Sequence, residues 1–193
     1  MKFCNQCGSK VQLRTPSGDH LARFICGTCQ TIHYQNPKIV AGSIPVWDDR
    51  VLLCRRAIEP RKDFWTLPAG FMENGESSLD AAIRETWEEA NAKINHIQLF
   101  GIFSLPHISQ VYLMFVGELA DGKAEAGVES SEVALFDEAD IPWQELAFPV
   151  IKESLILFFE DRKHGHYRTH VGDIYKDEQS NYRVVRHQAN FKP

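Results

Sequence analysis

The sequence has 193 residues, of which 44% are hydrophobic and 24% charged, so it suits one globular domain with a small addition and excludes a disordered, fibrous or membrane-spanning class. Its net charge of -5 gives no general attraction to polyanions, so we expect neither nucleic acid nor a membrane as a partner. The opening residues lack the apolar segment of a signal peptide, which predicts a cytoplasmic protein.

Four of the five cysteines form two Cys-x-x-Cys pairs, Cys4 with Cys7 and Cys26 with Cys29. An odd cysteine count with two such pairs favours a metal over disulfides. Four thiolates fill the tetrahedral shell of Zn²⁺ and leave no position for water, which predicts a structural zinc. We expect residues 1–36 to form a zinc ribbon, because this segment is too poor in apolar side chains to fold unaided. Two unrelated thiol pairs or a redox-active dithiol are the alternatives.

The rest of the chain mixes strands and helices, which predicts an α+β domain. Strands are predicted at 38–47, 50–55, 64–68, 97–104, 111–119 and 133–136. The glycine-bearing loop 70–75 leads to a helix predicted from Ser77 to about Ala92, and a second helix is predicted over 150–163. Residues 166–193 show no helical pattern and are interpreted as a C-terminal tail or arm, which leaves 37–165 as the main domain.

The first of these helices is unusually acidic on one side. Glu85, Glu88 and Glu89 fall on one arc, and the adjoining face carries the residues expected to pack, namely Leu79, Ala82, Ile83, Thr86, Trp87 and Ala90. Like charges at this spacing cost roughly 0.2–0.5 kcal/mol per pair unless a cation lies between them. Magnesium prefers carboxylate oxygens and is commonly shared with substrate phosphates. The pattern therefore predicts a Mg²⁺ site, with a solvated helix face as the alternative.

The stretch 70–92 resembles the Nudix hydrolase signature, G-x5-E-x7-R-E-U-x-E-E-x-G-U, where U is a bulky aliphatic residue. Six positions are in register: Gly70, Glu76, Arg84, Glu85, Glu88 and Glu89. Two positions depart from the pattern, since Thr86 replaces an aliphatic residue and Asn91 replaces the glycine that ends the helix. Thr86 still offers a methyl group, and asparagine is the next-best residue for a left-handed helix end. The resemblance implies a Nudix α/β/α sandwich with a mixed sheet, preceded by the Cys4 zinc ribbon.

The resemblance also implies the roles of individual residues. The metal, Mg²⁺ or Mn²⁺, is expected on the carbonyl of Ala69 or Gly70, on Glu85 and Glu89, and on a later glutamate matching Glu132. The implied catalytic residues are Glu76, Arg84, Glu85, Glu88, Glu89 and Glu132. Glu89 or Glu132 is expected to take the proton of the attacking water. The loop that holds Glu129 and Glu132 has a solvated surface as its alternative reading.

Residues outside the signature are candidates for binding the substrate. Arg55 and Arg56 are candidates for phosphate contacts, and surface solvation is the alternative for both. Trp65 and Phe148 are candidates for stacking on an adenine or flavin ring, as are Phe64 and Tyr112, and a place in the core is the alternative for such aromatics.

With its ribbon and Gln35-Asn36-Pro37-Lys38, the chain resembles the ribbon-bearing dinucleotide pyrophosphatases, and within them the FAD and ADP-ribose group. This resemblance implies Mg-dependent hydrolysis of a small nucleotide substrate that releases a nucleoside monophosphate, and it implies a homodimer. The Ser-Gln-Pro-Trp-Pro-Phe-Pro motif of NADH pyrophosphatases is not matched by residues 103–110, which disfavours NADH. The alternatives are a nucleotide-sensing regulator that binds nucleic acid through the ribbon, and a structural zinc scaffold.

Overall fold

The computed structural model describes residues 1–187 and divides into two compact units, Met1–Pro37 and the chain from Lys38 onward. The first unit is an antiparallel sheet with the order β1 (Val11–Arg14), β2 (Arg23–Cys26), β3 (Ile32–His33). Among its described residues, the buried apolar side chains are Cys4, Ile25 and Cys26. A unit with so little buried apolar surface has no ordinary hydrophobic core to stabilise it.

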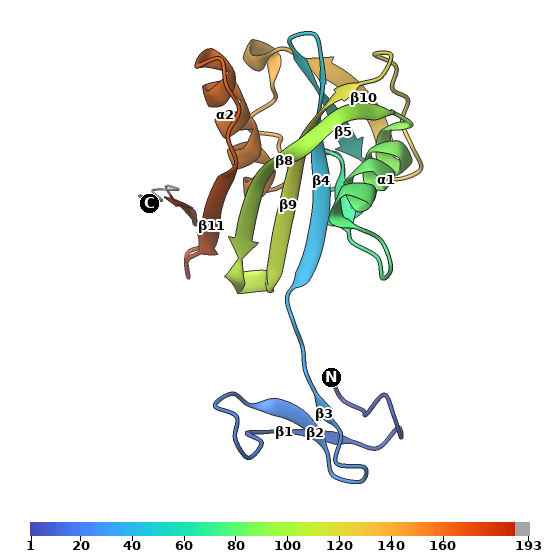
Figure 1. Ribbon diagram of the computed structural model, residues 1–193, viewed down its shortest axis with the longest axis vertical. Coiled ribbons are helices and arrows are strands. Elements are labelled where there is room, and N and C mark those ends of the chain that lie inside the picture. The colour runs from blue at the N-terminus through green and yellow to red at the C-terminus, as the bar shows by residue number, and fades with distance from the viewer. Residues whose placement is uncertain (188–193) are drawn as a thin grey trace. The chain divides into compact units, whose positions relative to one another are not determined.

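The second unit is built on one mixed sheet (Figure 1). Its strands are β4 (Lys38–Trp47), β5 (Arg50–Arg56), β6 (Trp65–Thr66), β7 (Ala69–Phe71), β8 (Ile94–Leu105), β9 (Gln110–Leu119), β10 (Ser130–Phe136), β11 (His170–Lys176) and β12 (Tyr182–His187). The order is β10-β5-β4-β9-β8-β11-β12, with β6 paired to β5 and β7 to β4. The pairs β4–β9 and β8–β11 are parallel and the other pairs are antiparallel, which confirms the predicted mixed sheet.

Two helices cover the sheet, α1 (Ser78–Ala90) on one face and α2 (Pro149–Lys163) on the other (Figure 1). Short 3₁₀ turns, η1 (Pro106–Ile108) and η2 (Glu138–Asp140), lie in the connections. Beneath α2 lies a large apolar core that includes Phe103, Leu155 and Phe158. Beneath α1, the helix contributes the small side chains of Ala81 and Ala82, which pack with Ala41 and Phe115. These layers confirm the predicted α/β/α sandwich. In the described part of the chain, neither helix has the length and apolar character needed to cross a membrane.

The two ends of α1 follow the predicted signals. The Ser77 hydroxyl accepts a hydrogen bond from the backbone N–H of Asp80 at 3.1 Å, which caps the first turn. Asn91 ends the helix in the left-handed region, with φ of 45°, and its N–H donates to the Trp87 carbonyl. The departure from the usual signature at Asn91 therefore still fits a helix that stops in the expected place.

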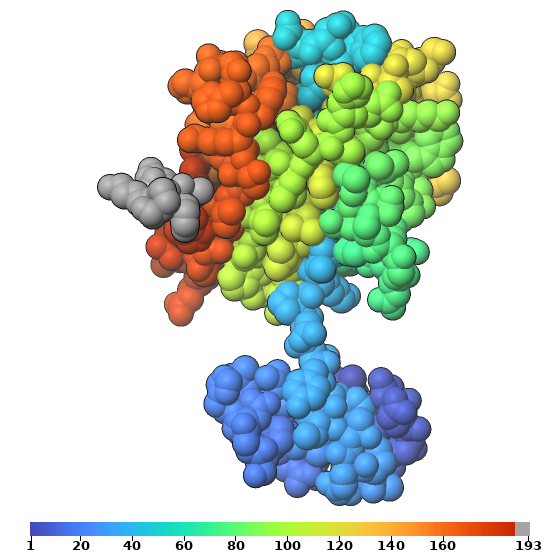
Figure 2. Space-filling model, in the orientation of Figure 1, coloured from blue at the N-terminus to red at the C-terminus, as the bar shows by residue number. Residues whose placement is uncertain are grey.

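The packing face of α1 differs from the one predicted. Leu79, Ile83 and Trp87 are 36–48% exposed, and the side chains of α1 lie at the surface beside those of β8 and β9 (Figure 2). Ala82, Thr86 and Ala90 are buried as predicted, and they are joined by Ala81 and by two glutamates. Because alanine holds the helix close to the strands, the acidic side turns inward. The predicted face is therefore confirmed for Ala82, Thr86 and Ala90 and wrong for Leu79, Ile83 and Trp87, because the buried side also includes Glu85 and Glu89.

Residues after 165, interpreted from the sequence as a tail or arm, include two strands of the main sheet. β11 pairs in parallel with β8, and β12 pairs with β11 in a hairpin. Ile174 at the centre of β11 is fully buried in the core beneath α2. The last part of the proposed arm, residues 188–193, lies outside the described residues.

Asp161 connects α2 to the segment that enters β11. Its buried carboxylate accepts a hydrogen bond from the backbone N–H of Arg168 at 3.0 Å and lies 2.8 Å from Nε2 of His170. Burial alone would raise the pKa of Asp161, but these hydrogen bonds outweigh it, and the net effect lowers that pKa.

We expect Asp161→Asn to lower the free energy of unfolding by about 2 kcal/mol at pH 7, because it replaces hydrogen bonds to a charged acceptor. The folded pKa is depressed, so this stabilisation is complete above the unfolded value of 3.8 and is lost as pH falls through the folded pKa. Urea unfolding of both proteins at pH 7 and near pH 3 measures the difference. A difference in unfolding free energy between the two proteins that stays constant down to about pH 3 would contradict this account.

Candidate active site

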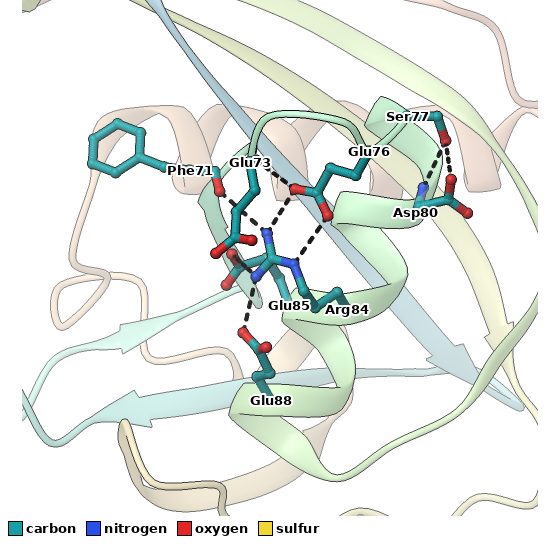
Figure 3. Close-up of polar contacts among 8 residues, drawn as sticks. All are labelled: Phe71, Glu73, Glu76, Ser77, Asp80, Arg84, Glu85 and Glu88. Carbon is teal, nitrogen blue, oxygen red and sulfur yellow. Dashed lines mark hydrogen bonds and ion pairs between the residues drawn. The ribbon is translucent and has the colours of Figure 1, made fainter.

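Arg84 lies at the centre of an acidic network on α1 (Figure 3). Its guanidinium donates two hydrogen bonds to Glu76, at 2.9 and 3.1 Å, and one each to Glu85 at 2.7 Å and Glu88 at 2.9 Å. A further bond reaches the Phe71 carbonyl at 3.2 Å. The bonds from Arg84 lower the pKa of Glu76, and Glu76 in turn raises the pKa of Arg84. The arginine therefore fixes three carboxylates and the loop before the helix.

Glu85 and Glu89 are the buried carboxylates of this helix, with 8% and 5% of each residue exposed. Within the described residues, Oε2 of Glu89 is buried and has no hydrogen-bond partner. Burial raises the pKa of Glu89 to about 8, and the charges of Glu85 and Glu129 act in the same direction, while Arg56 opposes them. Burial also raises the pKa of Glu85. Two buried carboxylates with an unused acceptor fit a bound cation.

The backbone of β7 lies directly against Glu85. A Cβ added to Gly70 would collide with the Glu85 carboxylate in this arrangement, so glycine allows β7 to approach the carboxylate closely. β7 pairs with β4 through Ala69 and Gly70, which holds both residues in place beside α1. The carbonyl groups expected to join the carboxylates are thus carried by a strand adjacent to them.

A loop packed on the C-terminal end of α1 adds a further carboxylate. The N–H groups of Glu125 and Gly127 donate to the carbonyls of Ala90 and Glu89, at 2.8 and 3.0 Å. A Cβ on Gly127 would collide with the helix backbone, so the contact requires glycine. This docking places Glu129 in the wall of the same cavity as the helix glutamates.

The cavity beside these carboxylates has a volume of about 1030 Å³. Of the residues predicted for the site, it is lined by Ala69, Gly70, Arg84, Glu85, Glu88, Glu89, Arg56 and Phe148. Arg56 lies over the Phe148 ring, 5.3 Å from its centroid, and Tyr112 completes this part of the wall. Positive charge and aromatic surface therefore adjoin the acidic site, an arrangement that suits a ligand with phosphates and a ring.

Five predicted residues lie outside the cavity wall, namely Arg55, Phe64, Trp65, Glu76 and Glu132. Glu76 binds Arg84 and accepts a hydrogen bond from the backbone N–H of Glu73. Glu132 faces Arg55 across the β5–β10 pair, with 3.5 Å between their charged atoms. Since side chains alternate along a strand, the position of Arg56 at the cavity turns Arg55 away from it. Trp65 is buried in the core against Phe136 rather than available for stacking. The structure thus corrects the predicted places of Arg55, Glu132 and Trp65.

The cavity also contains residues that the sequence did not single out as site residues. They include Glu129 in the docked loop, Gln110 and His107 at the β8–β9 turn, and Lys176 and Tyr182 in the last hairpin. Glu129 was noted only as part of an acidic loop, and the hairpin was placed in a tail. Their position depends on long-range pairing, for which the sequence carries no local signal.

The four ribbon cysteines converge in the first unit. Their sulfur atoms all lie within 4.8 Å of one another, with 3.6 Å between Cys4 and Cys29 and 3.5 Å between Cys7 and Cys26. Four sulfurs at 2.3 Å from a tetrahedral zinc lie about 3.8 Å apart, so the cluster fits that ion. A hydrogen bond with Thr31 lowers the pKa of Cys29 to about 6, which favours the thiolate that binds metal.

Comparison with known families decides the relationship. A family model described as NUDIX domain matches residues 37–185. The chain belongs to the Nudix hydrolase family. A second model, the zinc ribbon described as Nudix N-terminal, matches residues 2–35 of this Nudix protein. The predicted family and the predicted ribbon are both confirmed.

Individual relatives of this Nudix hydrolase have different named activities. The NAD-capped RNA hydrolase NudC of Vibrio atlanticus is 29% identical over 144 residues, which cover 74% of this chain and 51% of NudC. The ADP-ribose pyrophosphatase of Methanocaldococcus jannaschii is 31% identical over 121 residues, covering 60% of this chain and 69% of that protein. This chain therefore spans about half the length of the NudC relative.

A solved structure covers nearly the whole Nudix protein. The crystal structure of a NUDIX hydrolase from Nitrosomonas europaea is 54% identical, with a TM-score of 0.88, and the match covers 91% of this chain and 100% of that one. The ADP-ribose pyrophosphatase of Streptococcus suis is 20% identical with a TM-score of 0.58, which shows a shared fold alone.

Proposed function

We propose that this Nudix hydrolase cleaves the pyrophosphate bond of a nucleoside diphosphate linked to a second moiety, such as ADP-ribose or an NAD- or FAD-type dinucleotide, in a Mg²⁺-dependent reaction that releases a nucleoside monophosphate. The observation that carries the proposal is the pair of buried carboxylates, Glu85 and Glu89, in the wall of a cavity that also holds arginine and aromatic side chains. The names of the NudC and ADP-ribose pyrophosphatase relatives support this substrate class.

Glu85, Glu89, Glu129 and the carbonyl of Ala69 or Gly70 would hold Mg²⁺ or Mn²⁺. The unpartnered oxygen of Glu89 and the glycine at 70 fit such a ligand set. When bound, the metal neutralises charge on the phosphate oxygens and lowers the pKa of water. Glu129 takes the place that the sequence had given to Glu132, because Glu129 lines the cavity and Glu132 does not.

The other residues of the site position the reacting groups. Arg84 holds Glu85 and Glu88 in fixed orientations, so the carboxylates are arranged before the substrate arrives. Arg56 faces the cavity and attracts the diphosphate, while Phe148 offers its ring to a planar group. Glu89 or Glu129 accepts the proton of the attacking water, since general-base catalysis requires a carboxylate within reach of that water.

For the ribbon we propose a structural Zn²⁺ on Cys4, Cys7, Cys26 and Cys29, supported by the convergence of their sulfurs. Its basic residues, such as Lys10 and Arg14, are few, and we propose a small-molecule substrate rather than nucleic-acid binding. The homodimer and the cytoplasmic location stay predictions, as does the ribbon limit 1–36, whereas a limit at residue 165 would divide the sheet that includes β11 and β12. A nucleotide-sensing regulator is disfavoured because every carboxylate of the signature is present.

The experiment is a substrate screen with purified protein and Mg²⁺. The panel contains ADP-ribose, FAD, NAD⁺, NADH, a nucleoside triphosphate and NAD-capped RNA, with chromatographic detection of AMP and other monophosphates. We expect monophosphate release from at least one pyrophosphate-linked compound. Glu85→Gln should abolish the reaction, and Glu118→Gln, which alters an exposed carboxylate outside the cavity, should not. Equal activity of Glu85→Gln and the parent protein would refute the proposal.

Binding of the metal should also stabilise the fold. Because Mg²⁺ compensates the buried charges of Glu85 and Glu89, we expect the melting temperature to rise with its concentration. A concentration one hundred times the dissociation constant corresponds to about 2.7 kcal/mol. Differential scanning fluorimetry with MgCl₂, and with NaCl at matched ionic strength, measures the effect. Glu89→Gln should show little Mg²⁺-dependent shift, and a shift equal to that of the parent protein would count against the proposed ligand set.

A further inference from the structure

The C-terminal hairpin of β11 and β12 presents one face toward α2. Directly opposite residues of the hairpin share a face, and two successive pairs on this face are Ile174 with Val184 and Lys176 with Tyr182. The first pair packs in the core beneath α2. Lys176 and Tyr182 are the pair at the tip, and both are exposed. Lys176 and Tyr182 therefore lie on the same face of the hairpin as the core residues, but beyond the edge of the core.

The hairpin is held firmly to α2 behind this tip. Arg186 of β12 donates to the buried carboxylate of Glu153 at 2.6 Å and to Glu160 at 3.1 Å. Ile174 is fully buried, and β11 pairs in parallel with β8. These contacts determine where Lys176 and Tyr182 lie relative to the sheet, so the tip is a positioned surface.

The tip forms part of the wall of the active-site cavity. Tyr182 and Lys176 line the cavity together with His107 from η1. The His107 and Tyr182 rings lie 6.0 Å apart, and Nζ of Lys176 lies 5.8 Å from the centroid of the Tyr182 ring. The two turns thus give the cavity an aromatic and basic surface that is separate in sequence from the signature.

The same cavity is lined by other aromatic side chains from the rest of the domain, namely Phe71, Trp87, Tyr112 and Phe148. A volume of about 1030 Å³ lies at the upper end of the usual range for ligand pockets, roughly 300–1,000 Å³. A pyrophosphate with one attached nucleoside offers a single ring to these aromatic side chains. A ligand with a ring on each side of the pyrophosphate offers a second ring, which Tyr182 can contact.

We propose that Tyr182, with Lys176 and His107, forms a binding site for a second planar ring, and that this site selects dinucleotides over ADP-ribose. The inference rests on the proposed function and concerns the same cavity. The group recognised is a heteroaromatic ring that carries hydrogen-bond acceptors. Such a ring stacks on the tyrosine, and its acceptors receive hydrogen bonds from the lysine ammonium group. ADP-ribose has a sugar at that end and gains nothing from stacking.

The kinetic test compares kcat/KM for FAD, NAD⁺ and ADP-ribose in the parent protein, Tyr182→Ala and Tyr182→Phe. We expect Tyr182→Ala to lower kcat/KM for FAD or NAD⁺ roughly tenfold, in line with the loss of one stacking contact, and to leave ADP-ribose within about twofold. Tyr182→Phe keeps the ring and should retain most of the dinucleotide activity. Tyr175→Ala is the matched control, because this exposed tyrosine of the same hairpin lies outside the cavity wall.

An equal effect of Tyr182→Ala on all three substrates, or no effect on any, overturns the inference while leaving the hydrolase activity established. A binding measurement keeps the inference testable if no substrate is cleaved. Calorimetry with FAD, NAD⁺ and ADP-ribose in Mg²⁺ is carried out on Glu85→Gln with and without Tyr182→Ala. We expect Tyr182→Ala to raise the dissociation constant roughly tenfold for FAD or NAD⁺ and to leave that for ADP-ribose unchanged. Unchanged dinucleotide affinity, or no dinucleotide binding, overturns the inference, and circular dichroism confirms that each variant is folded.

Discussion

Glu129→Gln is expected to lower kcat/KM by roughly 10²–10³, whereas Glu132→Gln should stay within about threefold of the parent protein. Glu129 lies in the cavity wall, and its charge acts on both Glu85 and Glu89. Loss of this carboxylate removes either a metal ligand or the proton acceptor of the attacking water. Glu132 instead pairs with Arg55 at the surface, where an exposed ion pair contributes little.

The two glutamates form a matched pair, because they are three residues apart and glutamine preserves the shape of each side chain. Steady-state kinetics with the best substrate of the panel separates them, and titration with Mg²⁺ shows whether the apparent metal affinity falls in Glu129→Gln. The reverse ranking, with Glu132→Gln inactive and Glu129→Gln unaffected, would show that the loop adopts another arrangement when substrate binds.

Cys26→Ser is expected to unfold the ribbon. Cys26 is fully buried, and its sulfur lies 3.5 Å from that of Cys7, so its loss leaves three thiolates for an ion that needs four ligands. Comparable zinc peptides draw on the order of 10 kcal/mol of folding free energy from their metal. With so little apolar surface buried in residues 1–37, nothing in that unit replaces this contribution.

Zinc content by mass spectrometry should fall from one ion per chain to near zero in this variant. Limited proteolysis should then cleave within residues 1–37, while the second unit keeps its melting transition. Cys54→Ser is the matched control, since Cys54 is a buried cysteine of β5 outside the cluster. A parent protein that retains its protease resistance after complete zinc removal by a chelator would exclude a structural role for the metal.

Local signals made part of this molecule predictable. Ser77 and Asn91 mark the ends of α1 because a helix terminus requires particular side chains and a particular backbone angle at one position. The spacing from Gly70 to Glu89 placed the acidic network, since residues three and four apart share a helix face whatever surrounds it. Each Cys-x-x-Cys pair likewise places two thiol groups close together, and two such pairs supply the four ligands that a zinc ion needs.

Features that depend on contacts distant in sequence were missed. The choice between Glu129 and Glu132 is made by the loop that hydrogen-bonds to the last carbonyls of α1, and no pattern within the loop reveals that docking. The strands β11 and β12 become part of the sheet only through pairing with β8. Trp87 was expected in the core because its side chain is apolar, yet the helix turns it to the surface.

The alanines beneath α1 connect core packing to the acidity of the site. Ala81 and Ala82 are fully buried against Ala41 and Phe115, so methyl groups set the separation between the helix and the sheet. That separation fixes how deeply Glu89 lies, and its depth is the main cause of a pKa near 8. A bulkier residue at either alanine would lift the helix and return the glutamate to solvent. Substitutions at Ala81 or Ala82, which do not line the cavity, can thus change the proton affinity of Glu89 by altering the distance between the helix and the sheet.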